Sequence, residues 1–582
     1  MNSGAAPVVC DVCGIAPCQT PVFCETSRLA DRQRQAKQKD RKAKREKQAD
    51  VLVSLASKRA KFWHAADNTA FADIRVEKHR ETWPLRSRNF KLWLNRQYYE
   101  NHRSAPNSDA VQNALNVLEA KARFDGPERQ VNVRIAGANG KIYIDLGTSD
   151  WSAIEIDADG WRIVAKPPVR FRRSKGMLPL PLPKRDGDVK KLRSFLNVKS
   201  DEDFALVVAF LIATLRGRGP FIILVLTGEH GTAKSTLTRI VRALCDPNGA
   251  PLRSLPREDR DLFISANNGY LIAFDNVSEL KPWLSDSLAR LATGGGFSTR
   301  ELYTDSEETL FDAMRPIILN GIEDFVTRGD LADRAIVLTL AEISDDKRCD
   351  EEAFWEEFGQ VVPVILGGLL DAVAHGLEKL PDVKLARKPR MADFAKWVVA
   401  CEGKLPGPPG TFIRAYERNR GEAVQAMLES ESVVVVLQAF LTENTPWKGT
   451  AGDLLKALNT AATEEARKAK DWPKTPRGMS GALRRSAPGL RKLGYSVEFV
   501  KDTGKKRDRQ IELQAPVDMG QEPSAPSEPS NAATHSTFQA DGPPPQPSEQ
   551  PSASNAMKNE DADGADGSDD AAETLEEAAW TL

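Results

Sequence analysis

The sequence lacks a long apolar run and an N-terminal signal segment. No stretch of about 18 consecutive apolar residues is present, and the first residues do not combine a charged start with an apolar core. We therefore expect that the chain spans no membrane and works in the cytoplasm. Its 582 residues suffice for about three or four domains of roughly 150 residues each.

Cysteine is scarce, and most of it lies in one place. Only seven Cys occur, four of them within the first 24 residues. Those four are Cys10, Cys13, Cys18 and Cys24. In a reducing cytoplasm, tetrahedral zinc explains such a cluster better than disulfides do. Residues 1–27 are thus a possible zinc knuckle. The irregular second half of the cluster leaves loose thiols on an unstructured tail as an equal alternative.

The formal net charge is only −1, but positive and negative residues are unevenly distributed along the chain. From residue 516 onward the chain has one Lys and fourteen Asp or Glu, a balance of −13, which leaves +12 on the remainder. A basic body with an acidic tail fits a nucleic-acid partner, although ordinary surface charge is the alternative. The tail 515–582, rich in Pro, Ser and acidic residues, is expected to be disordered.

Two segments without a catalytic pattern follow the cysteines. Residues 28–59 are interpreted as a basic helix or linker, which either tracks phosphates or serves as a solubilising spacer. Residues 60–185 are expected to form an α+β accessory domain. In it, strands at 131–135 and 141–146 are joined by a Gly-Ala-Asn-Gly turn. The role of this domain is left open.

The most informative pattern is a buried strand, a glycine-containing loop and a helix. Seven residues, almost all large and apolar, at 221–227 precede Gly228, as in a central parallel strand. The next residues fit a P-loop, except that Ala233 replaces the second glycine. The predicted ATP-binding residues are Gly228, Glu229, His230, Gly231, Thr232, Ala233, Lys234, Ser235 and Thr236.

The chemistry of such a loop assigns roles to its residues. Backbone N–H groups and the helix N-terminus hold the phosphates, Lys234 reaches the β and γ oxygens, and the Ser235 hydroxyl binds magnesium. The methyl group of Ala233 is acceptable only if the backbone there avoids a glycine-only conformation, with Gly231 supplying the flexibility. His230 is interpreted as a solvent-facing loop residue rather than a catalyst.

Hydrolysis of a triphosphate needs a carboxylate for the metal, a polar sensor and a cation. Asp275 ends a second apolar strand at 270–275 and is the predicted Mg²⁺ ligand. Asn320 ends a third strand at 315–320 and is the predicted sensor, because the carboxyl ends of parallel strands form the binding edge. Arg334, before the strand 335–340, could reach a neighbouring subunit.

At this point the sequence resembles superfamily III helicases, which are ring ATPases of the AAA+ type, and especially phage, plasmid and poxvirus-type primase-helicases. The telling segments are Leu291–Tyr303, with a Thr-Gly-Gly element and Arg300, then Pro316–Gly321 and the Asp-Arg pair at 333–334. The resemblance covers roughly residues 190–345. It implies a DNA-gripping channel hairpin after the Thr-Gly-Gly element and a finger at Arg334, with Arg328 as the second candidate. The layout is also similar to uncharacterised ATP-binding proteins of bacterial mobile elements.

One departure from that family concerns the residue after Asp275. The family usually has a second acid there to orient the attacking water, whereas this chain has Asn276. An amide can position water but cannot take its proton. The base stays unassigned, with Glu229, Glu279 and Asp286 as candidates.

The C-terminal part is interpreted as DNA-facing. Residues 346–424 are expected to be helical and 425–514 to form a winged-helix-like domain, with Thr450 as a helix N-cap and a basic helix broken at Pro488. A small structural domain with ordinary surface lysines is the alternative. The predicted DNA contacts are Arg300, Arg484, Arg485, Arg491, Lys505, Lys506 and Arg507.

The predicted architecture is therefore α/β, with a P-loop NTPase (AAA+-like) core at 186–345 between these domains. The leading hypothesis is a DNA-dependent ATPase that acts as the replicative helicase of a phage or mobile element, as a homo-oligomeric, hexameric ring. The alternative is a DNA-binding ATP switch, such as a helicase loader. An N-terminal primase ranks below both, because residues 60–185 lack paired carboxylates.

Overall fold

The computed structural model describes residues 29, 32–34 and 47–516 with short gaps. The gaps are residues 296, 301–307, 312–313, 323–324, 327, 345, 347 and 502–508. Only the backbone is described at 297–300, 308–311 and 501. The four N-terminal cysteines, Lys505–Arg507 and the tail from 517 lie outside the described residues. The zinc and disorder predictions therefore stay predictions.

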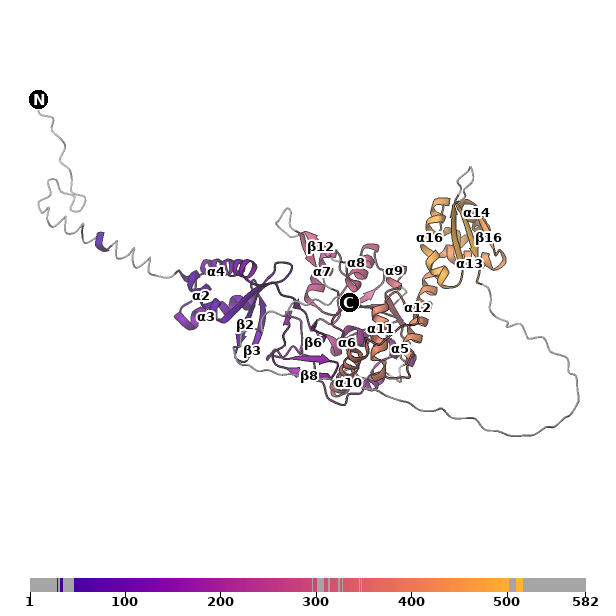
Figure 1. The fold of residues 1–582 in the computed structure, drawn as a ribbon. Coiled ribbons are helices and arrows are strands. Elements are labelled where there is room, and N and C mark those ends of the chain that lie inside the picture. The colour runs from indigo at the N-terminus through magenta and orange to yellow at the C-terminus, as the bar shows by residue number, and fades with distance from the viewer. Residues whose placement is uncertain are drawn as a thin grey trace, which may run out of the picture. The chain divides into compact units, whose positions relative to one another are not determined.

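The first folded segment places helices against a three-stranded antiparallel sheet of order β1-β2-β3 (Figure 1). Its elements are α2 (Gln48–Arg59), β1 (Ala60–His64), β2 (Ala70–Val76), β3 (His79–Pro84), α3 (Arg88–His102), α4 (Ser108–Ala120) and the π-helical turn η1 (Lys121–Asp125). Leu52 of α2 and Phe90 of α3 are fully buried. Residues 48–59, predicted to be a basic helix or linker, thus form a packed helix, because its apolar residues close this core.

A four-stranded antiparallel sheet of order β5-β6-β7-β8 comes next. The strands of this region are β4 (Val131–Asn132), β5 (Ile135–Ala138), β6 (Lys141–Asp145), β7 (Ala153–Asp157), β8 (Gly160–Val164) and β9 (Arg170–Phe171). The hairpin turns at Asn139 and Gly140, both with positive φ, as such turns require.

The strand predicted at 131–135 is wrong as a single strand. Arg134 adopts a left-handed φ of 62° and separates β4, which pairs with β9, from β5. The Arg134 side chain is 0% exposed, and its Nε lies 3.1 Å from Asp246 Oδ1. Its guanidinium also donates to the carbonyl oxygens of Asp145, Leu178 and Pro247. A buried guanidinium with four hydrogen bonds therefore fixes the bend.

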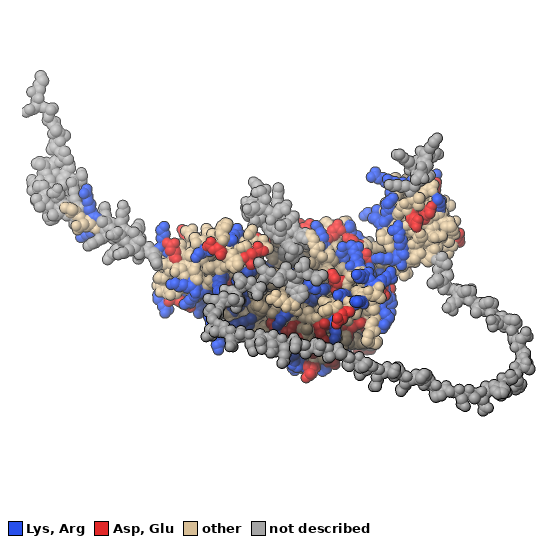
Figure 2. Space-filling model, in the orientation of Figure 1, with Lys and Arg blue, Asp and Glu red and all other residues tan. Residues whose placement is uncertain are grey.

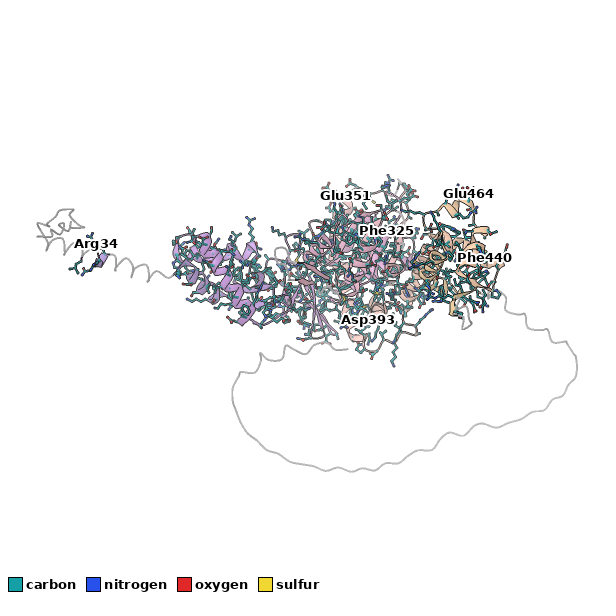
Figure 3. All side chains as sticks on the ribbon, turned by 90° about the horizontal axis from the view of Figure 1, so that it is seen from above. Arg34, Phe325, Glu351, Asp393, Phe440 and Glu464 are labelled. Carbon is teal, nitrogen blue, oxygen red and sulfur yellow. The ribbon has the colours of Figure 1, made fainter. Side chains whose placement is uncertain are left out.

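The central body is built on a parallel sheet of order β11-β14-β10-β15. Its elements are η2 (Val189–Phe195), α5 (Asp201–Thr214), β10 (Ile223–Thr227), α6 (Lys234–Cys245), α7 (Asp259–Asn268), β11 (Ile272–Val277), α8 (Pro282–Thr293), β12 (Phe297–Arg300), β13 (Glu308–Phe311), β14 (Ile317–Gly321), α9 (Gly329–Ala332) and β15 (Ala335–Thr339). Figure 3 shows its side chains from above, around Phe325, which is 3% exposed.

Both faces of this sheet are covered, which explains its continuous apolar strands. Along β10, Ile223 and Val225 join the core formed with α7 and α8, whereas Leu224 and Leu226 join the core formed with α5 and α6. Each of these four side chains is 0% exposed, a burial that typically contributes about 1.5–3 kcal/mol per side chain. The core formed with α5 and α6 also includes Ile144 of β6 and Ile154 of β7. This core therefore extends across the domain boundary predicted near residue 185.

Three helices follow the sheet: α10 (Glu351–Lys379), α11 (Ala392–Cys401) and α12 (Thr411–Glu429). By length and composition alone α10 could cross a membrane, with a mean hydropathy of 1.5 in its most apolar window. However, 61% of that window is buried inside the protein. Leu366, Leu369 and Leu370 are 0% exposed. We therefore interpret α10 as a core helix.

The C-terminal domain combines helices with a three-stranded antiparallel sheet of order β16-β18-β17. Its elements are α13 (Ser432–Glu443), β16 (Trp447–Thr450), α14 (Ala451–Ala461), α15 (Glu464–Lys468), α16 (Pro476–Lys492), β17 (Ser496–Lys501) and β18 (Arg509–Gln514). Thr450 is the N-cap of α14, as predicted, and it forms a reciprocal capping box with Asp453.

The predicted break in the basic helix at Pro488 is wrong. Helix α16 runs through Pro488 without interruption to Lys492. Proline there removes one backbone N–H, but buried neighbours hold the last turn in place: Ala487 is 2% and Leu490 0% exposed. Tertiary packing thus outweighs the local preference.

Candidate nucleotide site

The loop between β10 and α6 is shaped by two glycines in conformations that other residues rarely adopt. Gly228 has φ 136°, and a side chain there would approach the Leu340 carbonyl oxygen to 2.8 Å. Gly231 has φ 79°. The loop tip at Glu229, His230 and Gly231 is exposed, as predicted for His230. The tip of the loop before α6 is therefore accessible to solvent.

Ala233 does not avoid the conformation that favours glycine. It is the N-cap of α6 with φ 62° and ψ 27°, in the left-handed region. The condition set by the sequence, that the backbone at 233 avoids such a conformation, is not met. An L-residue in this region costs roughly 1–2 kcal/mol, so the loop keeps its shape at the expense of local strain.

Four predicted site residues converge at the carboxyl ends of neighbouring strands. The Ser235 hydroxyl donates to Asp275 Oδ2 at 2.9 Å, and Asn320 Nδ2 donates to Asp275 Oδ1 at 3.2 Å. Lys234 Nζ donates to the carbonyl oxygens of Gly228 and Glu229, each at 2.7 Å. Lys234 and Ser235 begin α6, Asp275 lies in β11 and Asn320 lies in β14, so the parallel register of the strands brings these residues together.

Thr238 is a member of this cluster that the sequence did not reveal. Thr238 is 0% exposed, and its single hydroxyl hydrogen lies between two acceptors, Asn320 Oδ1 at 3.0 Å and the Lys234 carbonyl oxygen at 3.1 Å from Oγ1. The bond to Oδ1 orients the Asn320 amide so that its nitrogen faces Asp275. The available signal was position: Thr238 lies one turn after Lys234, on the same side of α6.

The electrostatics of the loop depend on Lys234. Burial lowers the pKa of its ammonium group, and the charge of Asp275 partly offsets that effect. Its partners are neutral oxygens: the two carbonyls and the Thr232 hydroxyl at 3.1 Å. Polyphosphate oxygens carry full charge and would bind this ammonium group more strongly than neutral oxygens do.

The donor set at Ser235 and Asp275 suits magnesium. Both contribute oxygen, which is the ligand that Mg²⁺ prefers, and Mg²⁺ usually completes its shell with water and phosphate. Among the residues that the structure describes, no group of three or more His, Cys, Asp or Glu side chains could hold a metal ion. Ser235 and Asp275 would supply two oxygen ligands to Mg²⁺, and water and phosphate would supply the others.

Asn276, the departure at the end of β11, also has a left-handed backbone. Its φ is 58°, and the register of β11 on β14 shifts between Phe274 and Val277. Asn tolerates this conformation better than most residues. Asn276 is exposed, as are Glu229 and Glu279. A bulge at the strand end thus accounts for an asparagine at this position.

The two candidate finger residues lie beyond β14. Arg328 Nη2 donates to Asp286 Oδ1 at 2.7 Å, so that candidate base is ion-paired. Arg334 Nη1 donates to the Asp330 carbonyl oxygen at 2.7 Å. Burial is the main cause that lowers the Arg334 pKa. Both arginines are partly exposed.

The predicted DNA-binding segments are only partly described. Strands β12 and β13 pair antiparallel, Phe297 opposite Phe311, where the resemblance implies a hairpin. The Arg300 side chain is outside the described residues. On α16, Arg484 and Arg485 are exposed, and Figure 2 shows Lys and Arg gathered on the side of the domain where α16 lies. Arg491 Nε donates to the Val497 carbonyl oxygen at 3.0 Å, so this arginine is held within its own domain.

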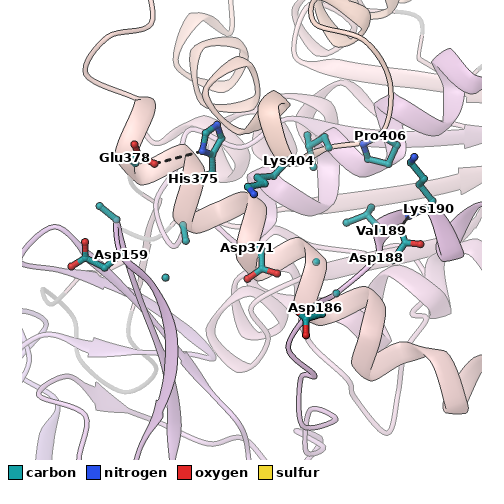
Figure 4. A pocket seen from close by; sticks show the side chains of 16 residues that line it. Asp159, Asp186, Asp188, Val189, Lys190, Asp371, His375, Glu378, Lys404 and Pro406 are labelled. Carbon is teal, nitrogen blue, oxygen red and sulfur yellow. Dashed lines mark hydrogen bonds and ion pairs between the residues drawn. The ribbon is translucent and has the colours of Figure 1, made fainter.

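A separate cleft of about 490 Å³ lies beside α10 (Figure 4). Asp371, on its wall, accepts a hydrogen bond from Trp161 Nε1 at 2.9 Å. His375 Nδ1 lies 3.6 Å from Glu378 Oε2. Asp371 thus pairs with Trp161, and His375 with Glu378. None of the nucleotide-site residues lines this cleft.

Two family models match the chain. Residues 189–404 match the model described as actinomycete integrative conjugative element replication protein. Residues 433–530 match the model of the AICE RepA C-terminal domain. The first match contains the whole nucleotide cluster, and the second contains α13–α16 and the strands β16–β18.

Among solved structures, the C-terminal region of NrS-1 is similar. One apo form of it has 12% sequence identity and a TM-score of 0.37, and the match covers 81% of this chain and 100% of that chain. A second, of residues 305–718, has 13% identity and a TM-score of 0.36, with 80% and 99% coverage. No curated protein matches the chain.

Proposed function

Since the chain belongs, through these two segments, to the family of actinomycete integrative conjugative element replication proteins, we propose that it is a DNA-dependent ATPase. In this proposal it acts as a replicative helicase that couples ATP hydrolysis to movement along single-stranded DNA. The observation that carries the proposal is the convergence of Lys234, Ser235, Asp275 and Asn320 at one sheet edge.

The proposed roles follow from the side-chain chemistry. Lys234 leaves its carbonyl partners to bind β- and γ-phosphate oxygens. Ser235 and Asp275 hold Mg²⁺, which when bound neutralises charge on the polyphosphate. Asn320, oriented by Thr238, donates a hydrogen bond toward the γ-phosphate and thereby senses whether it is present.

The DNA-facing roles are proposed on charge and exposure. Arg484 and Arg485 extend from the basic helix α16, where they can contact backbone phosphates. The β12–β13 hairpin grips one strand in a ring of subunits, and Arg334 completes the site of a neighbour. Each of these assignments rests on the resemblance as well as on the fold.

A specific observation favours the second candidate, an ATP switch that does not unwind DNA. Asn276 stands where a water-orienting acid would be, and its left-handed backbone, which Asn and Asp tolerate, disfavours replacement by Glu. Such a protein binds ATP and DNA, and its nucleotide state controls assembly.

The two candidates are separated by one assay. Purified full-length chain is mixed with a forked duplex, ATP and MgCl₂, and strand separation, ATP hydrolysis and DNA binding are measured. For a helicase, Lys234→Ala reduces hydrolysis about 100-fold, the size of effect typical when a charge-stabilising group is lost. Lys384→Ala, an exposed lysine outside the cluster, is the control. ATP and DNA binding without strand separation identifies the switch, and no ATP binding by wild type refutes both.

A further inference from the structure

We propose that Asn197 is a positioning residue of the nucleotide site. In this role, one side-chain amide holds the phosphate-binding loop against the segment that follows β15. The inference rests on the proposed function insofar as the loop binds ATP, and nothing in the sequence pattern pointed to this residue. It concerns the shape of the loop before any nucleotide arrives.

The position of Asn197 is fixed by its neighbours. It lies in the connection between η2 and α5, between Leu196, which is 5% exposed, and Val198, which is 7% exposed. Both flanking side chains are part of the core that covers one face of the parallel sheet. Because the buried Leu196 and Val198 flank Asn197, they anchor its backbone. The partly exposed Asn197 side chain lies at the surface of this core.

The amide of Asn197 makes two hydrogen bonds to separate segments. Its Nδ2 donates to the Thr232 carbonyl oxygen at 3.1 Å and to the Ala341 carbonyl oxygen at 2.7 Å. An asparagine amide has two N–H donors, so both are used. Thr232 belongs to the phosphate-binding loop, and Ala341 follows β15. The side chain therefore links three stretches of chain that are far apart in sequence.

The link reaches Lys234 through Thr232. The Thr232 side chain is 1% exposed; its hydroxyl donates to the Glu229 carbonyl oxygen at 2.9 Å and accepts from Lys234 Nζ at 3.1 Å. The base of the loop has its own attachment to the same edge strand, because Leu340 N–H donates to the Thr227 carbonyl oxygen at 2.9 Å. Asn197 supplies a second attachment, close to the end of the loop that carries the lysine.

The consequence is preorganisation of the loop. A loop held by two attachments needs less ordering when a polyphosphate binds, and reduced ordering improves affinity. Loss of both Asn197 hydrogen bonds should weaken ATP binding about tenfold, since each contributes a modest net stabilisation. The chemical step should change little, because Asn197 does not itself touch Asp275 or Ser235.

The matched control is Asn419, another asparagine that joins two elements. From α12, its Nδ2 donates to the Val337 carbonyl oxygen at 2.6 Å, and its Oδ1 accepts from Val337 N–H at 3.0 Å. Asn419 is 6% exposed, and its partner Val337 is a residue of β15, outside the phosphate-binding loop. Asn419→Ala should lower the melting temperature without selectively weakening ATP binding.

The test compares Asn197→Ala, Asn197→Asp and Asn419→Ala in the full-length chain, using a fluorescent ATP analogue for Kd and steady-state hydrolysis for KM and kcat. We expect Asn197→Ala to raise Kd and KM about tenfold with kcat within about twofold. Asn197→Asp should be worse, because its carboxylate would face two carbonyl oxygens. Equal Kd values for wild type and Asn197→Ala overturn the proposal.

A second measurement keeps this test independent of ATP binding. Hydrogen exchange of the loop amides 229–233, without nucleotide, should be faster in Asn197→Ala than in wild type and unchanged in Asn419→Ala. If wild type bound no nucleotide, the proposed function would fail, whereas faster exchange would still support the positioning role. Unchanged exchange in Asn197→Ala would refute that role whatever the activity.

Discussion

Replacement of Ala233 by glycine should stabilise the start of α6. Ala233 has φ 62°, where the side-chain methyl group costs roughly 1–2 kcal/mol relative to glycine. Glycine in turn increases the entropy of the unfolded chain, which costs about 0.4–1 kcal/mol. The difference predicts a net stabilisation of about 0.5–1 kcal/mol. The result is unusual, because Ala→Gly at a helix normally destabilises.

Native-state hydrogen exchange of the α6 amides is a suitable assay, because it reads local free energy in a chain of several domains. A gain of about 0.5–1 kcal/mol raises the protection of these amides roughly two- to fivefold. Ala243→Gly, in the same helix with ordinary helical geometry, is the matched control. It should lower protection about fivefold, since glycine costs about 1 kcal/mol in a helix interior.

The reasoning is refuted if Ala233→Gly lowers protection as Ala243→Gly does. Such a result would mean that the backbone at 233 is not left-handed in solution. ATP affinity is a second check, because position 233 contributes a backbone N–H whichever residue is present. Ala233→Gly should leave Kd within about twofold, since the phosphate donors are retained.

Three other predictions concern backbone geometry and one ion pair. Gly228→Ala should abolish ATP binding measured with a fluorescent analogue, because its methyl group would lie 2.8 Å from the Leu340 carbonyl oxygen at φ 136°. Asn276→Asp should lower the melting temperature slightly, because aspartate also tolerates left-handed backbone, and should raise ATP turnover if the missing acid limits hydrolysis. Burial raises the pKa of Asp333, but the hydrogen bond and charge of Lys492, with two arginines, lower it overall. A lowered pKa means that this carboxylate stabilises the fold above its ordinary pKa of 3.8 and loses that effect as pH falls through the lower folded value. In Asp333→Asn, acid titration followed by circular dichroism should lack this contribution, and an unchanged acid transition would contradict the assignment.

The strand-loop-helix unit and its partner strands could be predicted from the sequence because their signals are local. A central parallel strand has an uninterrupted apolar run, and its polar end residue marks the binding edge. Asp275 and Asn320 were placed this way, and one hydrogen bond joins them in the structure. Thr450 could be placed as an N-cap for the same reason.

The features that the sequence did not predict depend on contacts between distant residues. Arg134 interrupts the strand predicted at 131–135, because its guanidinium binds Asp246, 112 residues away. Helix α16 continues through Pro488 because its buried face packs on both sides of the proline. Asn197 and Thr238 resemble ordinary polar residues until the loop and strand ends are brought beside them.

The left-handed residues at 233 and 276 bear on whether the protein unwinds DNA. Both flank the nucleotide site, one before Lys234 and one after Asp275, and neither is glycine. Strain of this kind persists only where surrounding structure fixes the backbone. At residue 233 the structure that fixes the backbone is the start of α6, of which Ala233 is the N-cap. At 276 it is the bulge where the register of β11 on β14 shifts, between Phe274 and Val277. Because the amide of Asn276 cannot take a proton from water, an acid acting on water would have to come from another residue. A neighbouring subunit is the natural source in a ring, and a lone subunit would then bind ATP but hydrolyse it slowly. Turnover that rises with protein concentration and with DNA would support the helicase, whereas turnover per subunit that stays constant would contradict a shared site.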